Sequence, residues 1–452
     1  MSRIESRPTD GLSYSQSEPK YWERAGLEKE LTRVFDICNG CRLCFNLCPS
    51  FPTMFEAIEA HGGDAAKVKP EERERVVELC WGCKLCEIRC PYTPRDGHEF
   101  QLDFARLMQR AKALDARERK GGLRERLRDR MLGDPDTLGK VGSLIPAMAN
   151  WANTNQAHRF LMEKLVGIHR DKKLPEFVAE TFERWLSSNP LPPAPSEPAA
   201  KVALFYTCFI NYNDPEPGKA AVKVLARNQC AINCPRQNCC GMPALDGGDV
   251  EFARKQAQAN IDALLPLVRE GYRVAVINPT CSLMMRQEYP RLIATDASRT
   301  VAAAIADTHE LLYELRRANR FNRDFRSTPG TIAYHIPCHL KAQHIGLRSR
   351  DLMRLIPGVE ITTVDACCAH DGTWAMKREF FELSMKWGAR AFNGIHDAHA
   401  RVTASDCPLA ALQIEQATGV RPLHPLEILA RAYDSRGFAQ QIAPAPAGDK
   451  QA

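Results

Sequence analysis

The sequence lacks the features that mark several common classes of protein. No apolar run approaches the ~18 residues that a helix needs to cross a bilayer, so no membrane span is predicted. The net charge is only +6 over 452 residues, which argues against a dedicated nucleic-acid binder. No GxGxxG motif follows a strand-like run, so we expect no dinucleotide-binding site.

A secretory signal is also missing, because Met1 to Gly11 is polar and has no apolar core. We therefore expect a cytoplasmic protein whose membrane contact is at most peripheral, at the inner face of the cytoplasmic membrane. Cysteine, by contrast, is abundant: the chain has 18, and they fall in groups with repeated spacing. In a reducing compartment, such cysteines are metal or redox ligands rather than disulfide partners.

Two runs near the start share one spacing. They are Cys38-x2-Cys41-x2-Cys44-x3-Cys48-Pro49 and Cys80-x2-Cys83-x2-Cys86-x3-Cys90-Pro91. Bacterial ferredoxins use this spacing to bind two [4Fe–4S] clusters, and the fourth cysteine of each run ligates the other cluster. The spacing predicts one cluster on Cys38, Cys41, Cys44 and Cys90, and another on Cys80, Cys83, Cys86 and Cys48. Because paired CxxC is also zinc spacing, two structural zinc sites are the alternative.

Composition divides the chain into segments. We expect a loosely ordered polar arm over 1–30, a mostly helical dicluster domain over 31–100, a basic helical region over 101–187, a proline-rich linker over 188–200 and a disordered tail over 438–452. The stretch from Phe104 to Leu132 holds ten Lys or Arg against four acids. It is interpreted as a solvated charged face or as a docking face for a partner subunit or anionic lipid. The helically spaced Val141, Leu144, Ile145, Met148 and Trp151 are expected to pack in a core.

Beyond the linker, the chain repeats itself. The first module, 201–328, contains Cys208, Cys239, Cys240 and Cys281, and the second, 329–437, contains Cys338, Cys367, Cys368 and Cys407. Corresponding cysteines lie 130, 128 and 126 residues apart, which indicates a duplication. Strand-like runs precede the cysteines and helix-like stretches separate them, so we expect α/β modules with the ligands at the carboxyl edge of each sheet. Four thiolates from three places suit an iron–sulfur cluster or zinc.

Several neighbouring residues are weaker candidates. Gly241 lets the backbone approach a metal closely, and Ala369 replaces it in the second module. Thr280 is either a donor to a cluster sulfur or an ordinary strand-edge threonine. Each histidine near the second-module cysteines is interpreted as bonded to backbone, with metal ligation or proton transfer as the alternative. These histidines are His335, His339, His344 and His370, and Cys230 and Cys234 are interpreted as free thiols.

Four segments carry a resemblance to a known family. They are Asn238-Cys-Cys-Gly-Met-Pro, Asn278-Pro-Thr-Cys-Ser, Tyr334-His-Ile-Pro-Cys-His-Leu and His370-Asp-Gly-Thr-Trp. Together with the dicluster runs, they make residues 35–432 resemble the iron–sulfur subunit of anaerobic glycerol-3-phosphate dehydrogenase. More broadly, the chain is similar to heterodisulfide-reductase-related proteins with cysteine-rich CCG modules, including the iron–sulfur subunits of glycolate and lactate oxidation systems.

The resemblance implies a non-catalytic electron-transfer subunit of an anaerobic respiratory oxidoreductase. In that family a flavoprotein dehydrogenase oxidises glycerol 3-phosphate, glycolate or lactate, and the iron–sulfur subunit passes electrons toward membrane quinone. We therefore expect an α+β multidomain protein with two [4Fe–4S] clusters and further iron–sulfur clusters in the CCG modules. The implied partners are a flavoprotein subunit and a quinone or membrane-anchor subunit.

A self-contained heterodisulfide-reductase-like enzyme, acting on a disulfide at a CCG cluster, is the alternative. Such reductases close each module with CxxC, whereas the last position here is Met284 in the first module and Ala410 in the second. The missing fifth thiolate favours relay over catalysis. A third interpretation, a structural zinc protein that acts as a scaffold for partners, is distinguished by colour, because iron–sulfur protein is brown.

Overall fold

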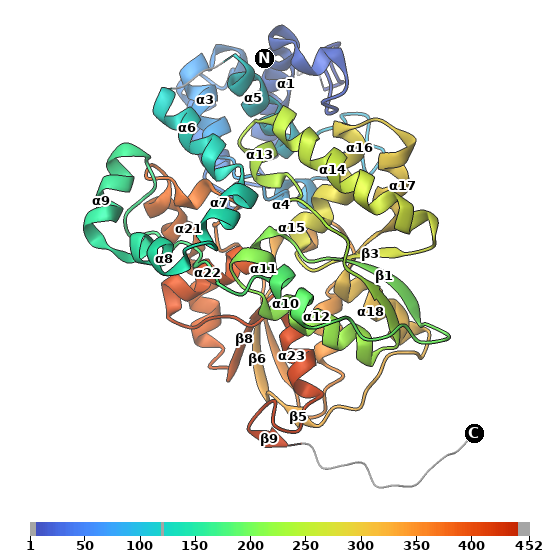
Figure 1. Ribbon diagram of the computed structural model, residues 1–452. Coiled ribbons are helices and arrows are strands. Elements are labelled where there is room, and N and C mark those ends of the chain that lie inside the picture. The colour runs from blue at the N-terminus through green and yellow to red at the C-terminus, as the bar shows by residue number, and fades with distance from the viewer. Residues whose placement is uncertain (1–5, 119–121, 442–452) are drawn as a thin grey trace.

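The computed structural model describes residues 6–118 and 122–441. A helical N-terminal domain lies at the top of Figure 1, two α/β modules lie below it, and α8 and α9 project from the left side. Among the described helices, none combines the length and the apolar character that a bilayer crossing requires.

The N-terminal domain is entirely helical. Its elements are η1 (Pro19–Trp22), α1 (Arg24–Cys41), α2 (Ser50–Ala60), η2 (Ala65–Lys67), α3 (Pro70–Leu79), α4 (Leu85–Arg89) and α5 (Phe104–Arg117). Helix α1 buries Leu27, Leu31 and Val34, which are the i, i+4 and i+7 positions of one face, and packs against α5. The expected loose arm is wrong for residues 6–30, because Tyr21 and Leu27 are buried in apolar cores. Residues 1–5 of that arm lie outside the described residues.

The basic stretch over 104–132 holds the domains together. Arg110 is fully buried in α5 and donates hydrogen bonds of 2.7 Å to the carbonyl oxygens of Tyr21 and Gly11. Arg106 forms a buried ion pair of 3.0 Å with Glu288 of module 1. The expected solvated or docking face is therefore wrong for these two arginines, because their partners belong to segments distant in the sequence.

Five helices connect the N-terminal domain to the modules. They are α6 (Leu123–Leu132), α7 (Pro135–Gly142), α8 (Pro146–Thr154), α9 (Gln156–Leu165) and α10 (Phe182–Ser188). The apolar residues that were expected to form a core are exposed instead, each by more than half of its surface: Val141, Leu144, Ile145, Met148 and Trp151. Helix α8 has no buried residue. The physical reason is that α8 and α9 lie at the periphery, where no described element covers their outer side.

Module 1 contains a four-stranded parallel sheet in the order β2-β1-β3-β4. Its elements are β1 (Ala200–Phe205), α11 (Cys208–Tyr212), α12 (Glu216–Arg227), β2 (Cys230–Asn233), α13 (Met242–Asp246), α14 (Val250–Arg269), β3 (Arg273–Val276), α15 (Pro279–Leu283), η3 (Met284–Glu288), α16 (Tyr289–Leu292), α17 (Asp296–Ala304), β4 (Ile305–Asp307) and α18 (Thr308–Arg317).

Module 2 contains a three-stranded parallel sheet in the order β7-β6-β8. Its elements are β5 (Ser327–Thr328), β6 (Thr331–His335), α19 (Cys338–Lys341), α20 (Arg348–Met353), β7 (Glu360–Val364), η4 (Trp374–Met376), α21 (Phe381–Asp397), β8 (Val402–Ser405), α22 (Pro408–Thr418), α23 (Pro425–Ala432) and β9 (Gln440–Gln441). The short β9 pairs with β5, and residues 442–452 of the expected disordered tail lie outside the described residues.

The two modules share one strand arrangement. In each, the first long strand lies between the next two, and Val202 faces Arg273 as Ile332 faces Val402. A helical dicluster region followed by two α/β repeats confirms the α+β multidomain fold predicted from the sequence.

Candidate metal centres

The first cysteine group forms where α1 ends. Cys38 and Cys41 lie on the last turn of α1, and Cys90 follows α4. The pKa of the Cys38 thiol is raised well above its usual value by burial and then by the neighbouring thiols of Cys44, Cys90 and Cys41. The four sulfurs are thus close enough to repel one another as thiolates, which is the environment that a cationic iron centre relieves. Cys41 is exposed, so this group lies at the surface.

The second group repeats this local geometry. Burial and the thiols of Cys83, Cys80 and Cys48 raise the pKa of Cys86 well above its usual value. The residue after the second cysteine of each run is left-handed: Arg42 has φ +51° and Lys84 has φ +59°. The left-handed residue turns the chain back, so that the third cysteine faces the first two. Each run thus brings three of its own cysteines together with the fourth cysteine of the other run.

The third group gathers at the carboxyl edge of the module 1 sheet. Cys208 begins α11 after β1, and Cys281 lies in α15 after β3. The Cys240 thiol lies in hydrogen-bond contact with the thiols of Cys239 and Cys281, and these contacts together with burial raise its pKa well above its usual value. Buried Asp136 of α7 accepts a hydrogen bond from the Cys239 N–H, a contact for which the sequence carries no signal.

The fourth group lies at the equivalent edge of module 2. Cys338 begins α19 after β6, and Cys407 follows β8. The pKa of Cys338 is raised well above its usual value by burial and then by Cys83, Cys367, Asp371 and Cys407. Because Cys83 belongs to the second group, the second and fourth groups adjoin.

The chain makes the same turn after each adjacent cysteine pair. Gly241 has φ +92° and Ala369 has φ +54°. In both modules the N–H of this residue donates to the sulfur of the pair's first cysteine, at 3.5 Å to Cys239 and 3.3 Å to Cys367. Alanine therefore keeps the backbone conformation for which glycine is better suited.

All eight module cysteines line one cavity of about 320 Å³, and Cys83 lines it as well. The cavity is otherwise mostly apolar, with Met131, Leu138, Ile168 and Phe177 in its wall. Converging thiols without other ligands, in an enclosed space of this size, fit iron–sulfur clusters. The sequence predicted a site in each module, and the tertiary structure joins both sites.

The candidate histidines have different environments. His335 is hydrogen-bonded to Ser405 Oγ and to the Ala366 carbonyl, each at 3.1 Å. His339 Nδ1 lies 2.9 Å from Thr280 Oγ1, so the hydroxyl that was expected to meet a sulfur or to be a strand-edge group instead links the two modules. Among the described residues, neither ring nitrogen of buried His370 has a partner, although His370 lines the cavity. His344 lies outside the cavity wall and is hydrogen-bonded to Arg95.

The positions without a thiol also differ. Met284 is fully buried in the module 1 core, whereas Ala410 lines the shared cavity. Cys230 lies at the amino end of β2, opposite the cysteine edge, and Cys234 follows the same strand. Neither Cys230 nor Cys234 lines the cavity.

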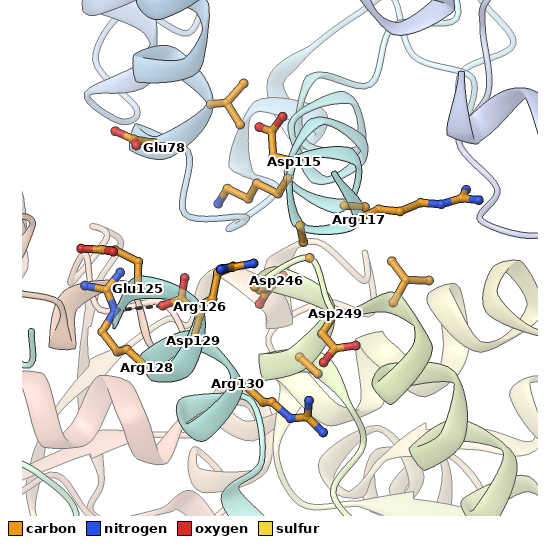
Figure 2. A pocket seen from close by; sticks show the side chains of 18 of the residues that line it. Glu78, Asp115, Arg117, Glu125, Arg126, Arg128, Asp129, Arg130, Asp246 and Asp249 are labelled. Carbon is orange, nitrogen blue, oxygen red and sulfur yellow. Dashed lines mark hydrogen bonds and ion pairs between the residues drawn. The ribbon is translucent and has the colours of Figure 1, made fainter. Parts of the chain in front are cut away.

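A second cavity, a cleft of about 1060 Å³, separates the N-terminal domain from α6 and α13. Figure 2 shows that its wall carries both signs of charge, including Arg126 and Arg130 on α6 and Asp249 before α14. Buried Arg128 pairs with Asp129 there at 2.9 Å. The side chains of α6 thus contribute to a mixed surface rather than to one basic face.

Comparison with known proteins agrees with this geometry. A 4Fe-4S dicluster domain model matches residues 30–112, and a cysteine-rich domain model matches residues 202–286 and 332–415. The iron–sulfur subunit of anaerobic glycerol-3-phosphate dehydrogenase from Escherichia coli is 30% identical over 407 residues, which cover 88% of this chain and 98% of that protein. The chain belongs to the family of this dehydrogenase subunit.

Other relatives of this family member are partial matches. The iron–sulfur subunit of a fumarate reductase (CoM/CoB) from Methanothermobacter marburgensis is 26% identical over 250 residues, covering 52% of this chain and 47% of that protein. Lactate utilization protein A from Geobacillus thermodenitrificans is 30% identical over 184 residues, covering 39% and 75%. The family and domain matches confirm the predicted iron–sulfur cofactors and replace the zinc interpretation.

Proposed function

We propose that this chain is a non-catalytic subunit that relays electrons from a flavoprotein dehydrogenase to the membrane quinone pool. The four cysteine groups would each hold a cluster: Cys38, Cys41, Cys44 and Cys90; Cys48, Cys80, Cys83 and Cys86; Cys208, Cys239, Cys240 and Cys281; and Cys338, Cys367, Cys368 and Cys407. When bound, such clusters accept and donate single electrons.

The contiguity of the four groups carries the proposal. The first and second groups adjoin, since Cys44 acts on the pKa of Cys86. The second adjoins the fourth through Cys83 and Cys367, and the fourth adjoins the third through Cys407 and Cys281. The series runs from exposed Cys41 to a buried cavity, which is the layout expected for a conductor with one end at the surface.

The exposed end suits contact with a donor protein. Leu43 and Phe45 follow Cys41 and are each exposed by half or more. Apolar side chains beside a surface redox centre favour a transient protein interface. The named relatives are subunits of a dehydrogenase and a reductase, which supports a partner subunit, and we assign the flavoprotein to this end.

The self-contained reductase remains the second candidate because the apolar cavity reaches the module cysteines. Ala410 lines the cavity where a reductase of that type would supply another thiolate, and this favours the relay. Turnover of a disulfide by the isolated protein with an artificial donor would support the reductase, whereas a relay shows none.

Cys83→Ser tests the relay. The variant is expected to lose most electron transfer from the flavoprotein subunit to a short-chain quinone, while the module signals in electron paramagnetic resonance persist. Cys234→Ser is the matched control, because Cys234 lines no cysteine group. Iron, acid-labile sulfide and spectra are measured on both. Electron transfer by Cys83→Ser at the parental rate would disprove the path.

A further inference from the structure

Most of the exposed large apolar side chains gather in one region. Of the thirteen that are exposed in the described part of the chain, ten lie between Leu123 and Leu165. Eight of these form what we call the α7–α9 apolar face: Val141, Leu144, Ile145, Met148, Trp151, Phe160, Leu161 and Leu165. Because α8 packs against both α7 and α9, these side chains belong to one helical projection, seen at the left of Figure 1.

The polar groups of this projection are turned inward. Asn150 donates to the Phe177 carbonyl at 2.9 Å and accepts from the Phe177 N–H at 2.8 Å. His158 Nδ1 is bonded to the Ala152 carbonyl at 2.8 Å, and Thr154 donates to the Asn150 carbonyl at 3.0 Å. A surface that enters hydrocarbon must satisfy its polar groups internally, and these side chains do so.

The charge pattern has one sign. No Asp, Glu, Lys or Arg occurs from Val141 to His158. On α7–α9 the exposed charged residues are Lys140 and Lys164, which flank this uncharged run, whereas Asp136, Arg159 and Glu163 are buried. Lysines at the border of an apolar surface complement anionic lipid headgroups, and Trp151 suits the membrane interface. A protein partner would more commonly be matched by charges of both signs at the rim.

The inner side of the same helices faces the cysteines. Leu138 of α7, Asn153 of α8 and Met162 of α9 line the 320 Å³ cavity that both module groups share. An acceptor dissolved in lipid would therefore enter a mostly apolar space next to the redox centres.

We infer that the α7–α9 apolar face inserts into one leaflet of an anionic bilayer and brings the cysteine-lined cavity to the membrane surface. The assignment of a lipid-dissolved acceptor rests on the proposed relay function. The insertion itself requires no electron transfer, so the two can fail separately.

The test uses flotation of the whole protein with phosphatidylglycerol–phosphatidylcholine vesicles and with phosphatidylcholine vesicles alone. Wild type is expected to float with the anionic vesicles and less with the neutral ones. Met148→Glu/Trp151→Glu is expected to weaken anionic-vesicle binding by about tenfold or more, since acidic side chains are costly in the interface. Val420→Glu is the matched control: Val420 is exposed outside this face, and its variant should float like wild type.

Iron content and circular dichroism establish that both variants fold. Three results would overturn the inference: wild type that does not float, a double variant that floats like Val420→Glu, or a wild-type dimer in sedimentation that the double variant abolishes together with no vesicle binding. The last result would assign the face to a second copy of the chain. Flotation that persists when the flavoprotein fails to reduce the protein would refute the relay and leave the membrane surface supported.

Discussion

Replacing Gly241 with alanine tests why both modules make the same turn after their cysteine pairs. Gly241 has φ +92°, and a Cβ there would lie 3.1 Å from the carbonyl oxygen of Ala253 and 3.3 Å from its Cα. A left-handed alanine costs about 1–2 kcal/mol. The reduced freedom of the unfolded chain returns about 0.4–1 kcal/mol. Because the contact with α14 adds strain, we expect Gly241→Ala to lower the free energy of unfolding by about 1–2 kcal/mol.

The reverse substitution in module 2 should behave differently. Ala369→Gly relieves about 1–2 kcal/mol of left-handed strain. It removes a fully buried methyl group worth about 0.8 kcal/mol. It also gives the unfolded chain more freedom, at a further cost of about 0.4–1 kcal/mol. The free energy of unfolding should therefore change by less than about 1 kcal/mol.

The assay is the urea midpoint, followed by the loss of cluster absorbance, together with iron per chain. Gly247→Ala is the matched control, because Gly247 has helical φ (−77°) and its nearest neighbours would lie 3.4 Å or more from a Cβ. We expect this control to be neutral or slightly more stable than wild type. If Gly241→Ala unfolds at the same urea concentration as Gly247→Ala, the left-handed turn does not explain the glycine.

Three further predictions follow from buried groups. Lys84→Met leaves buried Glu288 with Arg106 as its close partner, so the urea midpoint should fall by the lower end of the roughly 3–5 kcal/mol typical of a broken buried pair; an unchanged midpoint would contradict this. Burial raises the pKa of Glu427 from 4.5 to about 7, so its contribution is fully present below about 4.5 and is lost as pH rises through 7. The difference corresponds to at most about 3 kcal/mol, and Glu427→Gln should abolish this part of the pH dependence of the urea midpoint, whereas a slope equal to that of wild type would refute the assignment. Removing iron anaerobically with a chelator should lower the melting temperature of the helices, measured by circular dichroism, since metal binding is coupled to folding; equal melting of both forms would show that the groups are preformed without metal.

The sequence alone determined the ligand chemistry and the repeat. Cysteines two residues apart converge on one centre through a local turn, so the spacing of Cys38, Cys41 and Cys44 predicts a cluster without knowledge of the rest of the chain. The 126- to 130-residue recurrence likewise predicted two modules, and the matching strand registers agree with it.

Only the tertiary structure decided which surfaces are covered. Arg110 belongs to a stretch that was expected to be solvated and is fully buried, because carbonyl oxygens 89 and 99 residues away accept its hydrogen bonds. Trp151 belongs to a helix that was expected to pack in a core and is exposed by 59%, because no described element lies over it. Helical periodicity identifies the apolar side of a helix, but what lies against that side depends on contacts between segments far apart in the chain. The same dependence explains why two module sites, predicted separately, line one cavity.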